Sequence, residues 1–358
     1  MIIRYKKFHP GTNQTRATGG DVVEPGTNVN HLGKVRHIFT SPGTFTVTDP
    51  SLVSVRYLAV GGGGGGAGGW VRPSPFATWT AGGGGGAGGF VTSETTGSLT
   101  PSYEKHSWSN SPARIGSEFE VSSTETGGYA IVIGQGGAGG VGAPNWSPPS
   151  NGSGQRGLPG TNGGNTTIGT GPNQVVAWGG GGGANAQADF PSLGPPFPGT
   201  SYYKVGEPGG SGGGGAAFYA SGDKPLANGG NAADPAIPGT ENRSQGNPGF
   251  RASATPTSYA TAGGGGGAGP LPPNTPYNAS EPGGDGGWGM WSDLAPPSYG
   301  TPGPETGKRY FAGGGAGSGY FFRGISAPPA NTPHPTGCLL YTSPSPRDRT
   351  RSRMPSSA

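Results

Sequence analysis

Residues 61–69 read GGGGGGAGG and residues 82–89 read GGGGGAGG, and these two runs decide the fold. Neither run contains a side chain larger than the methyl group of Ala67 or Ala87. Glycine backbones approach each other closely because they carry no Cβ atom. In an extended helix of three residues per turn they form no internal hydrogen bonds, so every amide needs a partner on a neighbouring segment. We therefore expect these runs to pack side by side as polyglycine II rods.

Ten glycine-rich tracts of this kind recur along the chain. A flexible linker, which is the alternative interpretation, would use Ser as freely as Ala and would show no recurring unit. Ala is expected only where its methyl group points outward, since an inward side chain would separate the rods. The tracts cover residues 61–69, 82–89, 134–142, 152–164, 179–183, 206–215, 228–231, 263–269, 283–289 and 313–319.

The composition excludes a helical protein. Of 358 residues, 80 are Gly and 39 are Pro, the two residues least compatible with an α-helix. Such a composition usually indicates a disordered chain, but here the glycines are clustered. The expected fold class is mostly irregular and β, namely a polyglycine II helix sandwich with a small antiparallel β unit and essentially no α-helix.

Several segments beside the tracts alternate polar and apolar residues. Residues 44–48 and 52–60 are expected to form two strands separated by a turn. The second strand is expected to bury one face, which carries Val53, Val55, Tyr57 and Ala59. Shorter strands are expected at residues 117–121, 129–133, 174–178 and 320–325. We expect these strands to form one small antiparallel unit that holds the base of the rods.

The two ends of the chain are expected to lie outside the glycine-rich domain at residues 38–325. Residues 1–37 have no clear period and are expected to be an attachment segment or disordered, and residues 326–337 form a linker. Residues 338–358 look like translated sequencing-adapter read-through and are treated as a non-native tail; the alternative is a native basic tail that meets phosphate or an acidic partner. Much of the net charge of +4 lies in that tail, so the basicity does not indicate a nucleic-acid surface.

The order of strands and glycine tracts resembles the glycine-rich domain of bacteriophage tail proteins, and it is similar to the receptor-binding adhesins at the tip of T-even-type long tail fibres. The resemblance covers residues 38–325. The segments that carry it are TFTVTDPSLVSVRYLAVGGGGGGAGG (44–69), GGGGGAGGFV (82–91), FEVSSTETGGYAIVIGQGGAGG (119–140), GGNTTIGTGPNQVVAWGGGGG (163–183) and GGGAGSGYFFRGI (313–325).

This resemblance implies a binding protein rather than an enzyme. Its partners would be a bacterial outer-surface receptor, either protein or glycan, and a tail-fibre protein of the same virion. The chain would be assembled in the host cytoplasm and act extracellularly at the tip of the fibre. Neither a cofactor, nor nucleic acid, nor membrane insertion is expected.

If successive rods alternate in direction, their connections alternate between the two ends of the rods. The last five connections then run long, short, long, short and long, as a one-ended binding surface requires. The end with long loops is rich in aromatic residues, which offer rigid contact area at low entropic cost; they equally suit packing within the loops. The candidate receptor contacts are Trp70, Phe76, Trp79, Trp146, Phe190, Phe197, Tyr202, Tyr203, Phe250, Tyr259, Trp291, Tyr299 and Tyr310.

Motifs for catalysis or metal binding are weak. The chain has one cysteine, Cys338, and no hydrolase nucleophile motif. His31 and His37 are six residues apart, but we expect them in a solvated loop rather than on a metal. Scattered acids such as Asp285 and Asp293 are expected to be solvated rather than paired for glycoside cleavage. Two alternatives to an adhesin stay open: a structural glycine-rich protein without a specific ligand, and a polysaccharide-degrading tail enzyme.

Overall fold

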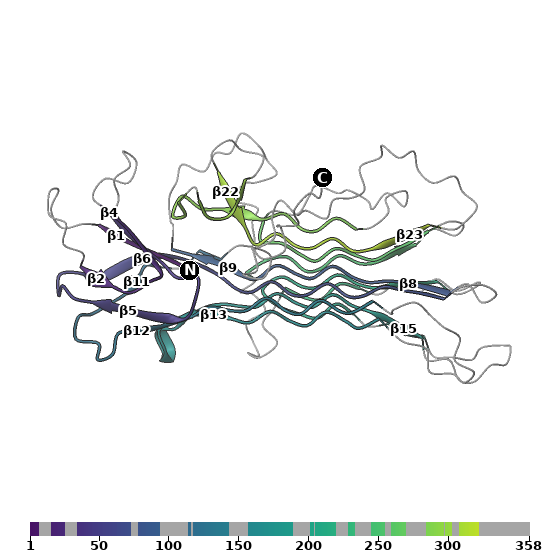
Figure 1. Cartoon of the computed structure of the whole chain (residues 1–358), viewed down its shortest axis with the longest axis horizontal. Coiled ribbons are helices and arrows are strands. Elements are labelled where there is room, and N and C mark those ends of the chain that lie inside the picture. The colour runs from purple at the N-terminus through teal and green to yellow at the C-terminus, as the bar shows by residue number, and fades with distance from the viewer. Residues whose placement is uncertain are drawn as a thin grey trace, which may run out of the picture.

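The computed structural model is an elongated molecule with a β sandwich at one end and a bundle of glycine rods at the other (Figure 1). Its described part contains no α-helix, only a short 3-10 helix at Gly171–Asn173. The expected fold class, mostly irregular and β, is confirmed. The structure describes residues 1–6, 16–25, 34–72, 78–93, 114–115, 117–142, 157–188, 201–203, 205–219, 228–232, 245–254, 259–269, 284–296, 298–302 and 308–321.

The sandwich consists of two sheets around one core. The first sheet has the order β10 (Arg114–Ile115), β9 (Phe90–Thr92), β6 (Ser54–Val60), β1 (Ile2–Lys6), β4 (Lys34–Ile38) and β3 (Val22–Pro25), with β11 (Phe119–Glu120) also paired to β6. The second has the order β14 (Val175–Ala177), β13 (Thr166–Ile168), β12 (Tyr129–Val132), β5 (Gly43–Val47) and β2 (Ala17–Thr18). Ile3, Phe45 and Ile168 are fully buried between the two sheets.

The described residues before position 38, namely 1–6, 16–25 and 34–37, are part of this sandwich, so the boundary expected at residue 37 is wrong. Strand β1 pairs with both β4 and β6, and β2 pairs with β5. The sequence IIRYK of β1 hides its period because both faces are buried: Ile3 packs in the core between the sheets, and Ile2 packs in a second core on the opposite face. On β6, Val55, Tyr57 and Ala59 are buried as expected, whereas Val53 precedes the strand and is 66% exposed.

The second core lies between the large first sheet and a small three-stranded sheet that covers it. Its order is β20 (Met290–Trp291), β22 (Arg309–Phe311) and β21 (Thr301–Pro302). Met290 and Leu294 pack against Leu58 and Phe90 of the large sheet. Two rod alanines, Ala87 and Ala268, also point into this core. The expectation that rod alanines point outward is therefore wrong for these two, while Ala138 is exposed as expected.

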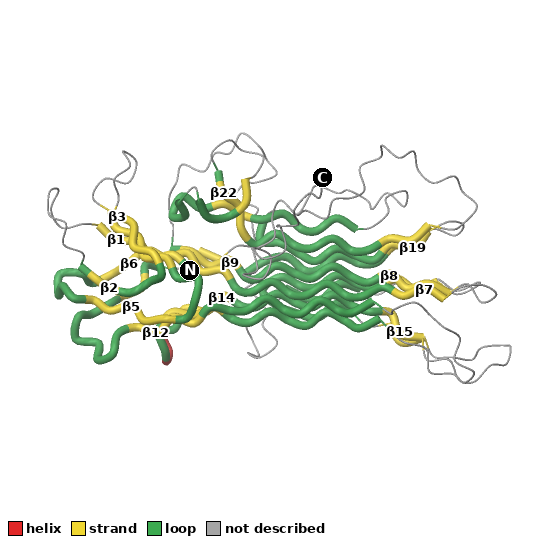
Figure 2. The backbone as a smooth tube through the Cα atoms, viewed as in Figure 1, coloured by secondary structure: helices red, strands yellow, loops and turns green. Residues whose placement is uncertain are grey.

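The glycine segments lie side by side and form a slab (Figure 2). Their backbones bond to one another with a period of three residues. The amides of Gly61, Gly64 and Ala67 donate to one antiparallel rod, at 82–89. Those of Gly62, Gly65 and Gly68 donate to another, at 157–164. Most glycines in contact with a second rod leave no room for a Cβ atom; at Gly64, for example, it would overlap the carbonyl oxygen of Gly181.

The segment at 211–215 is the most completely surrounded, and all five of its residues are buried. Its amides donate to the rods at 82–89, 245–252 and 205–209. Its carbonyl oxygens accept from the rods at 179–185, 228–232 and 262–269. One central rod is thus bonded to six neighbours, so the slab is held by main-chain hydrogen bonds instead of an apolar core.

Candidate functional site

The slab ends, on the side away from the sandwich, in a group of short strands that we call the distal end (Figure 1). Strand β8 contacts β15, β17, β19 and β23, so strands far apart in sequence meet there. The described strands of the distal end are β7 (Trp70–Arg72), β8 (Thr78–Ala81), β15 (Ala186–Ala188), β16 (Ser201–Tyr203), β17 (Ala217–Tyr219), β18 (Ser253–Ala254), β19 (Tyr259–Thr261) and β23 (Gly319–Phe321).

The distal end brings together the backbones of five candidate receptor contacts: Trp70, Trp79, Tyr202, Tyr203 and Tyr259. Four further candidates, Phe76, Trp146, Phe190 and Phe197, lie outside the described residues. Phe250 lies within the rod at 245–252 and not in a loop; its amide donates to Gly264, and its side chain is half-buried.

Trp291, Tyr299 and Tyr310 do not lie at the distal end, so their assignment to it is wrong. Trp291 and Tyr310 are buried in the second core beside the sandwich, and Tyr299 packs against that core. The ammonium group of Lys308 lies 3.6 Å from the ring centroid of Trp291, as in a cation–π contact. These aromatic side chains pack the small sheet of β20, β21 and β22 against the large sheet.

The expected alternation in the direction of successive rods fails at three places. This explains why Trp291, Tyr299 and Tyr310 were assigned to the wrong end. The tract at 206–215 contains a turn near Gly210 and supplies two antiparallel segments. The segment at 245–252 is a rod where a loop was expected. The rods at 262–269 and 284–289 run parallel, since Gly284 donates to Ala262 and Gly287 donates to Gly265. The segment at 216–219 therefore leaves the slab at the distal end, and the described residues 290–296, 298–302 and 308–312 lie at the opposite end.

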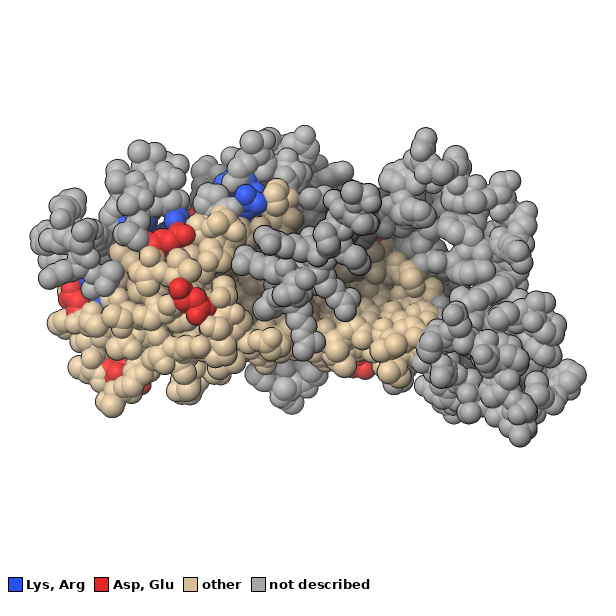
Figure 3. Space-filling view, in the orientation of Figure 1, with Lys and Arg blue, Asp and Glu red and all other residues tan. Residues whose placement is uncertain are grey.

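The charged side chains visible on one face gather over the sandwich, while the slab bears few (Figure 3). Among the described residues, no cluster of three His, Cys, Asp or Glu residues is arranged to hold a metal ion. Within the same ranges, no helix is long and apolar enough to cross a membrane. In this view the described part of the slab shows few charged side chains, and the sandwich carries most of the ionic groups.

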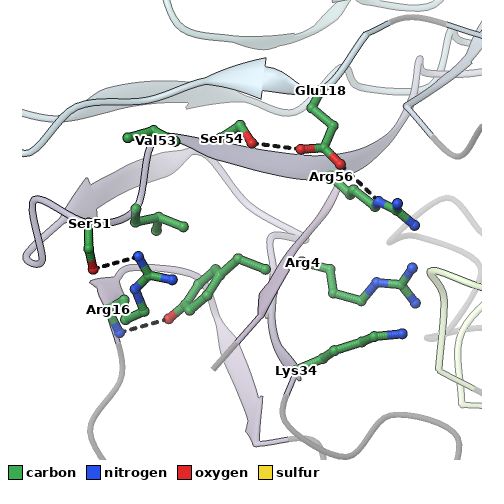
Figure 4. A pocket seen from close by; sticks show the side chains of 10 residues that line it. Arg4, Arg16, Lys34, Ser51, Val53, Ser54, Arg56 and Glu118 are labelled. Atoms are coloured by element: carbon green, nitrogen blue, oxygen red, sulfur yellow. Dashed lines mark hydrogen bonds and ion pairs between the residues drawn. The ribbon is translucent and has the colours of Figure 1, made fainter. Parts of the chain in front are cut away.

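One group of cations lines a cavity of about 470 Å³ at the end of the sandwich, which we call the basic pocket (Figure 4). Its described lining contains Arg4, Arg16, Lys34 and Arg56, with Glu118 as the single carboxylate. Arg56 Nε donates to Glu118 Oε1 at 3.0 Å. Arg16 is held by Asp49 at 3.3 Å and by the Ser51 hydroxyl at 2.7 Å. Sequence reasoning missed this site, because its residues are far apart in sequence and meet only through strand pairing.

His37 is fully buried in β4, so the expectation of a solvated loop is wrong for it. Its Nδ1 lies 2.6 Å from the carbonyl oxygen of Gly19, and its Nε2 lies 3.2 Å from the hydroxyl of Tyr5. A neutral imidazole satisfies both contacts by donating to Gly19 and accepting from Tyr5. Burial lowers the pKa of His37 below its ordinary value, against the opposing effect of the Gly19 contact. His31, its expected neighbour, lies outside the described residues.

Comparisons with protein-family models, curated proteins and solved structures found no match to this chain. The distal end and the basic pocket are accordingly interpreted from their own residues and geometry.

Proposed function

We propose that the chain is a receptor-binding adhesin of a bacteriophage tail fibre, and that it recognises a bacterial surface receptor, protein or glycan, through the distal end. The observation that carries this proposal is the convergence of β8 with β15, β17, β19 and β23 at one end of a densely bonded slab. Binding loops are typically positioned by a rigid scaffold. The distal end would then face the cell, and the sandwich would face the fibre.

Loop replacement tests this assignment. In two variants, residues 73–77 between β7 and β8, or residues 189–200 between β15 and β16, are replaced with short Gly-Ser linkers. The matched control replaces residues 95–112 between β9 and β10 of the sandwich in the same way. The fluorescently labelled full chain and its variants are titrated onto a panel of bacterial strains.

We expect saturable binding of the unmodified chain to at least one strain, loss of that binding in both distal variants, and its retention in the control at an unchanged melting temperature. Absence of saturable binding to every strain would favour a structural glycine-rich protein and contradict the adhesin. Release of reducing sugar from the cells would instead identify a polysaccharide-degrading enzyme.

A further inference from the structure

One edge of the slab leaves backbone groups without partners. Gly137 of the rod at 134–142 donates to the Gly63 oxygen at 2.8 Å, and one turn later Gly140 donates to the Gly66 oxygen at 2.8 Å. Within the described residues, the amides of Gly63 and Gly66 donate to no group, and the oxygens of Gly137 and Gly140 accept from none. We call these four residues the open edge. Gly66 is exposed and the other three are half-buried, so the edge is accessible from outside the slab.

The central rod at 211–215 shows how the groups of one residue point. Gly214 donates to Gly84 and accepts from Ala184, and Ala184 itself accepts from Gly83 of the first of these rods. The N–H and C=O of one residue thus bond to two rods that are also bonded to each other. All five residues of the central rod follow this rule.

At the open edge, the unpaired groups surround a single site. Gly63 accepts from the rod at 134–142, so its N–H points to a position beside that rod. Gly137 donates to the rod at 61–69, so its C=O points to a position beside that second rod. On one side of the pair this position is filled by the rod at 157–164, which bonds to both. The unpaired groups therefore face the other side, where one further rod would accept from 61–69 and donate to 134–142.

The outward residues of the rod at 134–142 keep that position clear. Gly136, Gly139 and Gly142 form one row along the rod, and all three are exposed. A Cβ at Gly139 would have no neighbour closer than the Gly66 oxygen at 3.8 Å, so contacts inside the slab do not require glycine there. The Cβ would instead lie over the open edge. A longer side chain in this row would obstruct an added rod.

Two surface rods of this chain show a sequence that fits such a position. They read GLPG at 157–160 and GNPG at 246–249. A Cβ at Gly160 or Gly249 would overlap a carbonyl oxygen of a neighbouring rod, so the glycines face inward. Proline fixes φ near the value of the extended three-residue helix. It therefore lowers the entropy that a free segment loses when it is ordered on binding.

We propose that the open edge binds an extended segment of a second protein that carries Gly-X-Pro repeats, and that this segment is added to the slab as one more rod. Main-chain hydrogen bonds would hold it as they hold a strand that is added to the edge of a sheet. Glycine at every third residue would provide the specificity. The open edge lies between β6 of the sandwich and β7 of the distal end, and this inference does not depend on receptor binding.

Residue-resolved hydrogen–deuterium exchange of the full chain with the peptide (Gly-Asn-Pro)4 tests the proposal. At about 3.1 Å per residue, the peptide spans about 37 Å and the rod at 134–142 about 28 Å. We expect saturating peptide to slow exchange at Gly63 and Gly66 and to leave exchange in 211–215 unchanged. The matched peptide (Ala-Asn-Pro)4 keeps the prolines but adds a Cβ at every third residue, so it should have no effect.

Two variants of the rod locate the peptide. Gly139→Gln places a side chain over the open edge and should abolish the slowing at Gly63 and Gly66. Ala138→Gln is the control, because it adds a side chain at the preceding exposed position, in a row that already carries Gln135 and Val141. It should respond to the peptide as the unmodified chain does.

Several results would overturn the proposal. These are exchange at Gly63 and Gly66 that the glycine peptide does not slow, equal slowing by the alanine peptide, or equal loss of the effect in Gly139→Gln and Ala138→Gln. A dimer that sedimentation detects and Gly139→Gln abolishes would assign the open edge to a second copy of this chain. Unchanged melting temperatures of both variants make each result attributable to the open edge, and the cell-binding titration reports separately on the distal end.

Discussion

Gly64 shows why glycine is required where two rods are in contact. A Cβ at this position would overlap the carbonyl oxygen of Gly181 on the neighbouring rod, whereas a Cβ at Gly63 has no neighbour closer than the Gly86 oxygen at 3.8 Å. We expect Gly64→Ala to lower the free energy of unfolding by about 3 kcal/mol, since the backbone must move. Urea denaturation followed by circular dichroism measures this change.

Gly63→Ala is the matched control, because it adds the same methyl group one residue earlier in the same rod. Replacing glycine with alanine lowers the conformational entropy of the unfolded chain. Where the native conformation accepts alanine, this stabilises a protein by about 0.4–1 kcal/mol. We therefore expect Gly63→Ala to raise the free energy of unfolding slightly. Equal destabilisation by both substitutions would mean that the two glycines do not face different surroundings.

The buried imidazole of His37 makes stability depend on pH. An unfolded histidine has a pKa of about 6.5, and burial lowers the pKa of His37 in the folded chain. The unfolded state therefore binds the proton more readily, and stability falls as the pH drops from about 6.5 through the folded pKa. We expect His37→Asn, which keeps a donor near Gly19, to reduce the fall of the melting temperature between pH 7 and pH 5. The part of the fall that remains comes from the buried amino group of Met1, whose pKa desolvation lowers to about 5.

Asp21 does not interfere in that pH range. Hydrogen bonds from the Ser41 hydroxyl and the Thr40 amide hold its pKa at about 2. A slope that is the same in His37→Asn and in the unmodified chain would contradict the assignment of the pH dependence to His37.

The three-stranded sheet of β20, β21 and β22 covers one face of the large sheet, and Leu294 beside β20 is fully buried under it. Leu294→Ala removes apolar contacts and leaves a cavity, so we expect it to cost about 3 kcal/mol of unfolding free energy. Binding to cells should be unchanged at a temperature where the variant is folded. Cell binding is measured in the titration used for the loop replacements. Its loss in the folded variant would indicate that Trp291 and Tyr310 contribute to receptor binding.

Glycine runs were predictable as rods from sequence, and the rod at 157–164 lies within the expected tract at 152–164, whereas the rod at 245–252, with glycine at every third position, was missed. In the segment at 157–164, Gly157, Gly160 and Gly163 face other rods, while Leu158 is 55% exposed. The segment at 245–252 follows the same rule with Gly246 and Gly249. A rod at the surface needs glycine only on its inner face, as collagen does, so a search for spacing of three would have found it.

The turn inside 206–215 also had a local signal that the glycine run concealed. Residues 207–211 read EPGGS, and Pro followed by Gly is typical of a tight turn. Rod direction after that point depends on which neighbours complete the hydrogen bonds of each backbone. That is a property of the assembled slab, so the placement of Trp291, Tyr299 and Tyr310 did not follow from counting connections.

Over the whole molecule, the sequence predicted the glycine slab, the strands β5, β6, β12 and β14, and their position at the base of the rods. The strand expected at 320–325 was wrongly placed at the base, since β23 (Gly319–Phe321) pairs with β19 at the distal end. It did not predict that β1 to β4 complete the sandwich. Strands β1 and β4 are buried on both faces and show no alternation, while β2 and β3 have only two and four residues. The basic pocket was equally hidden, since Arg4, Arg36 and Arg56 are far apart in sequence and meet only through strand pairing. Trp70, Trp79, Tyr202, Tyr203 and Tyr259 were correctly grouped by backbone, and their role in binding stays a prediction.

The central claim is that glycine backbones satisfy one another's amides, and residue-resolved hydrogen–deuterium exchange tests it most directly. The amides of 211–215 all donate to neighbouring rods, as do those of Gly62, Gly64 and Gly65, whereas within the described residues Gly63 and Gly66 donate to none. We predict strong protection throughout 211–215 and at Gly62, Gly64 and Gly65, with fast exchange at Gly63 and Gly66. Uniformly fast exchange across both segments would contradict the account.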